Sequence, residues 1–577
     1  MTKSSSAEYF SKNLQQVGFS SFTKATLTTV KEAIDNSLDA CEDHGVLPDI
    51  RVEVDRLGLG TAKGADLIRV RVQDNGPGLT LEDAVKVFGQ YLASSKFGRG
   101  RCSRGQQGIG ISAVTTWSQL THGTGATVIT RTKGMKNAVQ CEICVDIKKN
   151  VGILKTKQIV DWDQLSGVSC EFIMDARVQL NGDGGIITYL QGTALVNPHL
   201  NLRYKLLDAE EVFIERVSDT VPLIPERTSP HPHTMKLGEF LAHSHLFGKT
   251  NTKKWLKEGF SRISDTVIKE LIEKGMPESV FNKTLSSVSE DQLKQIYAGL
   301  QDVKLMAPPT KSVMAIGEAD LAKCIQRLGE IDFFAVETRK PTICDYKPIQ
   351  VEVAIARRRE KSEDDRDSPV QILRFANRVP LQFDKSACAM TKAVETVNWR
   401  PYGLTQPKKS LPQGPYIIAI SLVSPFIKFK NASKETVDAS DELVEEIRHA
   451  LQKCGHKLSA HLNREIKEAD MERKIQHLEQ FAPILVDGLC RITRSNEKRK
   501  ERAMAGLEKI LGKDSREAEK EFIHAQEKSE DATKLMAENM GVSHEELLEQ
   551  MHGNGENDNE RDMPEQLELI VNTGSGK

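Results

Sequence analysis

The chain has 577 residues, of which 39% are hydrophobic and 28% charged, and its formal net charge is −2. These values predict a soluble globular protein of about three or four domains. They exclude a basic surface over the whole chain, so any contact with nucleic acid must be local. The first residues lack the apolar segment of a signal peptide, and no stretch approaches the roughly 18 apolar residues of a membrane helix. We therefore expect a cytoplasmic protein with no membrane partner.

The first part of the chain alternates helical and strand patterns. Residues 26–44 predict a helix, whose apolar stripe consists of Val30, Ala33, Ile34, Leu38 and Cys41. Alternating side chains then predict strands at 50–54, 67–73, 126–132, 138–147 and 169–174. The glycine-rich segment between the first two strands predicts a hairpin connection. Together these elements indicate an α/β layer with helices against one face of a mixed sheet.

Ten cysteines are too few for a disulfide scaffold in a chain of this length. Cys141 and Cys144 form the one suggestive pair, and both fall on a predicted strand. Residues three apart on a strand point to opposite faces, which is poor geometry for a shared metal ion. Ordinary packing is therefore the favoured interpretation, and a metal or redox role is the alternative.

The later elements change character twice. Residues 229–310 predict short helices, and residues 348–425 return to strands, with a helix near 385–397 and a charged loop at 357–367. From about residue 434 a long helix is predicted, which Pro483 should kink or interrupt. Its apolar face consists of Leu443, Ile447, Leu451, Leu458, Leu462 and Ile466. We expect the acidic tail after about residue 541 to be partly disordered.

Glu32 and Asn36 are four residues apart on the first predicted helix and therefore share one of its faces. A carboxylate there can act as the general base for an attacking water. An amide oxygen one turn away is a suitable ligand for Mg²⁺. Taken alone, an exposed acidic face that includes Asp35 and Asp39 is the simpler explanation.

The segment Asp74-Asn75-Gly76-Pro77-Gly78 follows directly after a predicted strand. Taken alone it is typical of a turn. A carboxylate at a strand end can also accept a hydrogen bond from the amino group of adenine. Gly76 and Gly78 would then let the backbone approach the base closely.

A glycine-rich segment leads into the next predicted helix and consists of Gly105, Gln106, Gln107, Gly108, Ile109, Gly110, Ile111 and Ser112. Glycines with free N–H groups at a helix N-terminus can bind phosphate. The polar stretch 91–104 before it predicts a mobile lid, with Ser95 and Lys96 placed to meet phosphate. Each of the three motifs is weak alone, but their order and spacing together favour an ATP site.

The three motifs together resemble the Bergerat ATP-binding fold of the GHKL superfamily, shared by gyrase, heat-shock chaperones, histidine kinases and mismatch-repair ATPases. The resemblance implies that Glu32 is the general base, Asn36 the Mg²⁺ ligand and Asp74 the acid that binds adenine. Residues 105–111 match the triphosphate loop. On a later strand, where the superfamily often has Gly-Thr, this chain has Gly167-Val168-Ser169, and Ser169 could substitute for the threonine.

The rest of the chain resembles the B subunits of topoisomerase VI, the type IIB topoisomerases. The segments that carry this resemblance are SPHPHTMKLGEFLAHS at 229–244, GFSRISDTVIKELIEKG at 259–275, KLMAPPT at 304–310 and SPFIKFKNASKETV at 424–437. On this match Lys434 reaches the γ-phosphate, whereas without it Lys434 would be taken for a solvated loop lysine. Many members have Glu-Asn-Ser where this chain has Asp35-Asn36-Ser37, a change that leaves the expected base, Glu32, unaffected.

The resemblance implies an α/β (α+β) multidomain fold. Its parts are a Bergerat-fold α/β sandwich, a small helix-two-turns-helix domain and a second, ribosomal S5-like α/β transducer with a long C-terminal helix. The implied boundaries are an N-terminal exchange arm at 1–20, the ATPase domain at 21–228, the helical insert at 229–310, the transducer at 311–475, a helical stalk to the A subunit at 476–540 and an acidic tail at 541–577.

The same resemblance implies an ATP- and Mg²⁺-dependent subunit of an A₂B₂ heterotetramer. Two copies would dimerise through their ATPase domains when ATP binds and would exchange residues 1–20. This closure would gate the passage of one DNA duplex through a double-strand break made by the A subunit, relaxing supercoils and decatenating DNA. Such a protein would be cytoplasmic and associated with the nucleoid.

DNA cleavage needs a tyrosine nucleophile and usually an acidic metal-binding cluster, and neither stands out in this chain. We therefore expect that it does not cut DNA alone. Basic candidates for DNA contact, with solvated helix faces as the alternative, are Lys249, Lys253, Lys254, Lys257, Arg262, Arg494, Lys498, Arg499 and Lys500.

Two other functions fit parts of the sequence. One is an ATP-dependent chaperone or clamp that does not act on DNA, from which DNA-stimulated ATP hydrolysis would distinguish a topoisomerase subunit. The other is a non-hydrolysing scaffold, such as a meiotic-recombination relative. The intact Glu32, Asn36, Asp74 and glycine loop favour hydrolysis.

Overall fold

The computed structural model describes residues 5–506 apart from 94–99, 101, 106, 107, 360–366, 409, 432, 433, 495, 500 and 504. The chain forms one compact unit up to Asn463, and a second unit begins at Arg464. Four of the expected phosphate-site residues, Ser95, Lys96, Gln106 and Gln107, lie outside the described residues, as does the tail after residue 541.

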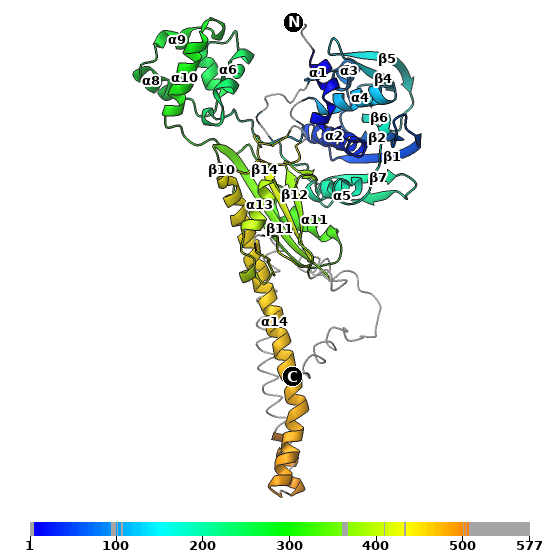
Figure 1. Ribbon diagram of the computed structural model, residues 1–577, viewed down its shortest axis with the longest axis vertical. Helices are drawn as coiled ribbons and strands as arrows, with labels where there is room; N and C mark the ends of the chain where they lie inside the picture. Colours follow the sequence, from blue (N-terminus) through cyan, green and yellow to red (C-terminus); the bar gives the residue numbers. More distant parts are fainter. Residues whose placement is uncertain are drawn as a thin grey trace. The chain divides into compact units, whose positions relative to one another are not determined.

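An eight-stranded mixed sheet organises the N-terminal part of the chain (Figure 1). In spatial order its strands are β5 (Val151–Val160), β4 (Ala138–Asp146), β3 (Ala126–Arg131), β6 (Gly167–Ala176), β2 (Asp66–Asp74), β1 (Asp49–Leu59), β7 (Asn201–Leu206) and β8 (Val212–Ile214). The predicted β1–β2 hairpin is confirmed, and only β1 and β7 pair in parallel. The sequence pattern missed β5, because this edge strand is exposed along most of its length and shows no apolar alternation.

The helices α2 (Phe22–Asp43), α3 (Leu81–Gly89) and α4 (Gly110–Thr121) pack side by side on one face of this sheet (Figure 1). Helix α2 begins where the hydroxyl of Ser21 caps its N-terminus by accepting a hydrogen bond from the backbone N–H of Lys24. The predicted apolar stripe of α2 is buried against the sheet. The expected α/β layer is therefore confirmed, and it fixes the position of the residues on α2.

A separate helical region follows. Its helices are α6 (Leu237–Leu246), α7 (Thr252–Gly259), α8 (Asp265–Glu273), α9 (Glu278–Asn282) and α10 (Glu290–Asp302). They enclose their own hydrophobic cluster, in which Phe240, Trp255 and Ile296 are fully buried. The predicted short helices in this part of the chain are confirmed.

A second sheet contains β10 (Thr342–Cys344), β11 (Lys347–Arg358), β14 (Tyr416–Val423), β12 (Gln371–Ala376) and β13 (Val379–Leu381), with β9 (Ile331–Thr338) paired to β11. The chain crosses from β12 to the parallel strand β14 through α13 (Ala389–Thr396). Strand β11 continues through Arg358, so the charged loop predicted from residue 357 begins later than expected, and its centre lies outside the described residues.

The long helix α14 (Asp441–Ile492) packs its first turns against the second sheet through Ile447, Leu451 and Leu458. Its apolar face was predicted to continue to Ile466, but Ile466 is 58% exposed. Pro483 was predicted to kink or interrupt this helix; the interruption is wrong, since α14 runs through this position, and the kink stays a prediction. A proline removes one backbone hydrogen bond, and the turns on either side retain theirs. Among the described residues, no helix is long and apolar enough to cross a membrane.

His231, at the start of the helical region, packs against the tip of the β10–β11 hairpin. Its ring stacks on Tyr346 at a centroid distance of 5.1 Å, and His233 meets the same ring edge-on at 4.9 Å. Asp345 and Tyr346 both have positive φ, as in the tightest hairpin turns. His231 is 1% exposed, and its Nδ1 accepts a hydrogen bond from the backbone N–H of His233. Burial, with smaller contributions from His233 and Arg262, lowers the pKa of His231 to about 4.

Acidification is expected to weaken this contact. The pKa of His231 in the folded chain lies below its ordinary value of 6.5, so its stabilising contribution is complete above pH 6.5 and is lost as the pH falls toward 4. Between pH 7 and pH 5 the loss should be about 2 kcal/mol. Hydrogen exchange in α10, corrected for intrinsic rates, should accelerate at pH 5 in wild type. His231→Asn keeps an acceptor but cannot titrate, and an equal acceleration in this variant would refute the assignment.

Candidate functional site

Asp74 lies at the end of β2 and is 6% exposed. Its carboxylate accepts hydrogen bonds from the hydroxyl of Ser37 at 2.7 Å and from the backbone N–H groups of Gly76 at 2.9 Å and Val168 at 3.2 Å. Burial raises the pKa of Asp74, and these three donors oppose the shift. The carboxylate is thus held in one orientation from three sides at the strand end, where the sequence predicts it.

The backbone around Asp74 has no room for side chains at two glycines. A Cβ on Gly78, whose φ is +75°, would lie 2.1 Å from the carbonyl oxygen of Arg131, and one on Gly167 would lie 2.1 Å from that of Asp74. The geometry also explains why valine can stand at position 168, where the superfamily often has threonine. Val168 contacts Asp74 through its backbone N–H, which a valine offers as well as a threonine does.

The N-terminus of α4 lies directly against Glu32. A Cβ on Gly110 would stand 1.7 Å from the carboxylate oxygen Oε2 of Glu32, so the Glu32 side chain lies directly against the Gly110 backbone and would have to shift for any side chain there. Ile109 occupies the cap position of α4 and provides no side-chain hydrogen bond to its first N–H groups. Such N–H groups at a helix start attract anions.

The remaining side chains of the glycine-rich segment anchor it to the core. Ile111 is buried, and Ile109 packs against the same hydrophobic cluster. Ser112 is 1% exposed, and its hydroxyl donates to the carbonyl of Gln90 at 2.8 Å. These three residues therefore turn their side chains inward, and only their backbone is available to a ligand. Gly108 has φ +61°, a conformation that favours glycine.

Lys434 lies beside Glu32, although the two residues are far apart in the sequence. A cavity of about 20 Å³ is lined by Glu32 and Asp35 of α2 and by Lys434, which precedes α14. The ammonium of Lys434 donates to the carbonyl of Arg104 at 2.8 Å. Burial lowers the pKa of Lys434, and the nearby Glu32 opposes that shift. The two residues predicted as catalytic are thus brought together across the fold.

Asn36 is half-buried on the face of α2 that carries Glu32, and among the described residues its side chain has no hydrogen-bond partner. One amide oxygen suits Mg²⁺, which usually combines few protein ligands with phosphate and water oxygens. No group of three or more His, Cys, Asp or Glu side chains within the described ranges could hold a metal ion by itself. Cys141 and Cys144 are both buried, as the packing interpretation predicts.

Three residues at the site were not singled out from the sequence. Ser37 holds Asp74, Tyr189 donates to Asp35 at 3.1 Å, and Arg104 pairs with Asp39 at 2.9 Å. Burial raises the pKa of Asp35 to about 6. Only Ser37 had a signal in the sequence, because it follows Asn36 on the helix. The contacts of Tyr189 and Arg104 join segments far apart in the chain.

Several of the basic residues suggested for DNA contact already have partners. Lys253 and Lys257 both pair with Asp265, and Arg262 donates to the carbonyl of Ala307. Lys254 lies 3.9 Å from Glu258. Of the remaining candidates, Lys500 lies outside the described residues.

Comparison with known proteins agrees with both resemblances. Residues 24–147 match the family described as Histidine kinase-, DNA gyrase B-, and HSP90-like ATPase, and residues 308–474 match the family described as Topoisomerase VI B subunit, transducer. The ATPase region of Saccharomyces cerevisiae topoisomerase II is 10% identical, with a TM-score of 0.39 over 80% of this chain and 98% of that one, a likeness too weak to carry an argument.

The sequence relatives are much closer. The chain is 36% identical over 461 residues to the B subunit of type 2 DNA topoisomerase 6 from Methanococcoides burtonii, covering 80% of this chain and 72% of that one. It is 34% identical over 487 residues to the protein of the same name from Archaeoglobus fulgidus, covering 84% and 79%. The chain therefore belongs to the family of type 2 DNA topoisomerase 6 B subunits.

Proposed function

We propose that this chain is the ATP-binding and ATP-hydrolysing B subunit of a type IIB DNA topoisomerase. The observation that carries the proposal is the cavity in which Glu32 and Asp35 meet Lys434, beside Gly110 at the start of α4. A carboxylate, a lysine and free helix N–H groups at one point are what phosphoryl transfer to water requires.

Each residue has a distinct role in this proposal. Asp74 accepts a hydrogen bond from the adenine amino group, and Gly76 and Gly78 let the backbone approach the base. Asn36 provides one oxygen to Mg²⁺, which neutralises phosphate charge when bound. Glu32 takes a proton from the attacking water.

The phosphates contact mainly backbone. The N–H groups of the segment 105–112 bind them at the start of α4, and Lys434 stabilises the charge on the γ-phosphate. Ser95, Lys96, Gln106 and Gln107 would add polar contacts from the lid and the loop.

We propose the domain boundaries expected from the sequence as functional parts. In the exchange arm, Phe10 stacks on Tyr91 with ring centroids 5.3 Å apart, and Phe19 stacks on Trp117 at 5.4 Å. A second copy offers the same aromatic surface. Exchange of the arm between copies in the ATP-bound dimer therefore needs no new binding site.

Partner binding is assigned to the end of α14. An apolar surface, here called the stalk surface, is lined by His477, Phe481, Ile484, Leu485, Gly488, Leu489 and Ile492. The side chains of Phe481 and Ile484 are 58% and 67% exposed. Large apolar side chains that gather on an exposed helix face usually mark an interface. We assign the stalk surface to the A subunit of an A₂B₂ assembly.

Changing Leu485 to Asp should abolish co-purification of the A subunit, because a charge buried in an apolar interface costs several kcal/mol. ATP binding should be unchanged, since Leu485 belongs to the second unit. Lys474→Asp introduces the same residue outside the stalk surface and should retain the A subunit. If both variants retain this partner, the assignment is removed.

The proposed function as a whole is tested by co-expression with a candidate A subunit. Supercoiled plasmid should be relaxed only when both subunits, ATP and Mg²⁺ are present, and DNA should stimulate ATP hydrolysis. ATP hydrolysis indifferent to DNA, with no relaxation, would instead indicate a chaperone or clamp. Action on the chromosome also implies a location at the nucleoid.

A further inference from the structure

The turn between β12 and β13 inserts an arginine into the first sheet's helical layer. Its two residues, Asn377 and Arg378, have φ of +49° and +61°, as in a tight two-residue hairpin turn. Hairpin tips normally lie in solvent, yet Arg378 is 4% exposed. Its guanidinium donates to the Oε2 of Glu42 on α2 at 2.5 Å, and its carbonyl accepts from Asn197. This tip is therefore anchored in the ATP-binding part of the fold.

Glu42 is the centre of a closed charge cluster. Its Oε1 accepts from Arg104 at 2.7 Å and faces His199 at 2.9 Å, while Arg378 holds its Oε2. Burial lowers the pKa of His199, which favours its neutral form. Arg104 and Arg378 are then balanced by two carboxylates, those of Glu42 and Asp39. Burial by itself would raise the pKa of Glu42, but the two arginines hold this pKa well below its usual range.

Arg104 connects this cluster to the glycine-rich segment. It directly precedes Gly105, and the backbone N–H groups of both residues donate to the carboxylate of Asp39 at 3.4 and 3.2 Å. Its side chain is held by Glu42, and its carbonyl by Lys434. The second sheet and its flanking loop thus reach the start of the phosphate loop twice, directly through Lys434 and indirectly through Arg378.

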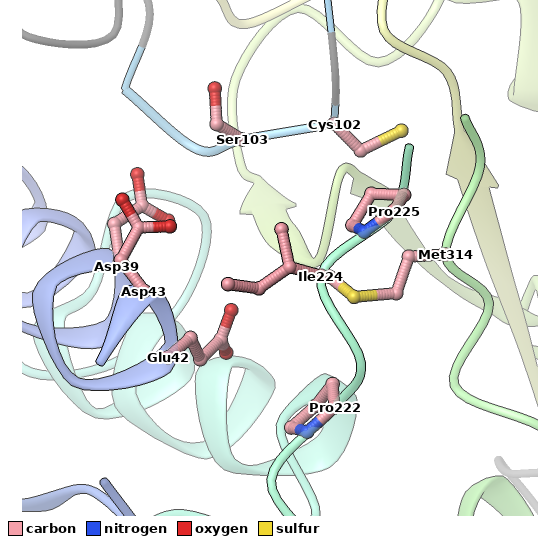
Figure 2. Close-up of a pocket in the computed structure, with 9 residues that line it drawn as sticks. All are labelled: Asp39, Glu42, Asp43, Cys102, Ser103, Pro222, Ile224, Pro225 and Met314. Atoms are coloured by element: carbon pink, nitrogen blue, oxygen red, sulfur yellow. The ribbon is translucent and has the colours of Figure 1, made fainter. Parts of the chain in front are cut away.

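The cavities beside this charge cluster are small. Figure 2 shows Asp39, Glu42 and Asp43 of α2 facing Cys102 and Ser103, with Pro222, Ile224, Pro225 and Met314 completing the wall. This cavity measures about 20 Å³, which is room for a single water. An adjoining cavity lined by Glu42, Arg104 and Arg378 measures about 10 Å³. If Arg378 moves, Glu42 loses one of its two arginine partners, and Arg104 is the one that remains.

We propose that Arg378 is a positioning residue for ATP hydrolysis, which holds Arg104, and through it the start of the phosphate loop, by way of Glu42. The inference rests on the proposed ATPase function and deepens it. Gly105, at the start of the phosphate loop, is positioned for hydrolysis only while the β12–β13 tip is inserted. Displacement of the tip changes the position of Arg104 even where Lys434 is unchanged, because Glu42 then pairs with one arginine instead of two.

The test compares three variants of the full chain. Arg378→Met removes the charge at similar length. Arg378→Met combined with Glu42→Gln removes both partners, leaving Asp39 and Arg104 balanced. Arg339→Met is the matched control, since Arg339 follows β9 and pairs with Glu446 of α14, not with the β12–β13 tip or the cavity that Glu32 lines. Thermal unfolding, kcat and KM for ATP are measured for each.

Arg378→Met is expected to lower kcat by about 10-fold to 100-fold, the effect of a misplaced catalytic group, with a smaller change in KM. The double variant should recover thermal stability but keep the low kcat, because the link to Arg104 is still missing. Arg339→Met should lose stability and retain kcat.

Recovery of kcat in the double variant would overturn the proposal, because it would show that Arg378 only neutralises Glu42. An unchanged kcat in Arg378→Met would overturn it as well. Absence of ATP hydrolysis in the wild-type chain would instead refute the proposed function, so the two failures are distinguishable.

Discussion

Replacement of Glu32 by glutamine is expected to lower ATP turnover by about 10²-fold to 10⁴-fold, the usual contribution of a general base. The amide has the same shape, so the contact with Gly110 is preserved, but it cannot accept a proton from water. ATP binding should therefore persist, and ATP-dependent dimers should accumulate. The measurement is steady-state hydrolysis beside binding of a fluorescent ATP analogue.

Glu171→Gln is the control for this change. Glu171 lies on β6 and pairs with Arg71 at 2.6 Å, outside the cavity that Glu32 lines. Its turnover should match that of wild type. Turnover within about threefold of wild type in Glu32→Gln would exclude Glu32 as the base, because a missing general base costs much more.

Replacement of Asp74 by asparagine should weaken ATP binding by about 10²-fold or more. Asp74 accepts from three donors, and an amide must turn its NH₂ toward one of them. The loss of one charge-assisted hydrogen bond, together with the changed contact to adenine, accounts for roughly 3 kcal/mol. Isothermal titration with a non-hydrolysable ATP analogue measures the effect.

Asp175→Asn tests whether the loss of any hydrogen-bonded carboxylate near a strand end weakens ATP binding. Asp175 on β6 also accepts from a hydroxyl and from backbone N–H groups, those of Thr61 and Ala62. This variant should lose stability but bind the analogue normally. Equal loss of affinity in the two variants would show that Asp74 acts only through the fold.

The parts of the site that could be predicted are those set by local geometry. Glu32 and Asn36 share a helix face because of their spacing, and Asp74 ends a strand whose alternation is plain in the sequence. Gly110 belongs to a helix start that glycine spacing indicates. These are properties of short segments, which is why they can be recognised before the chain is folded.

The parts that could not be predicted depend on contacts between distant segments. Arg104 stands in a polar, basic stretch and looks like a solvated lid residue, yet it is 4% exposed among carboxylates. Arg378 looks like a hairpin-tip residue. Its burial follows from the contact of the β12–β13 tip with Glu42 of α2, which no local pattern encodes. The prediction that Ile466 is buried was wrong for the opposite reason. The apolar period of the helix continues beyond the end of the surface against which the helix packs.

The backbone contact of Val168 with Asp74 has a consequence for how this family varies. Because the N–H group makes the contact, a change of side chain at position 168 leaves this hydrogen bond in place as long as the strand register is kept. Gly167 has no such freedom, since any side chain there would collide with the Asp74 carbonyl. A search pattern that demands threonine after this glycine would pass over chains that hold the strand-end aspartate in the same way, whereas one that demands only the glycine would retain them.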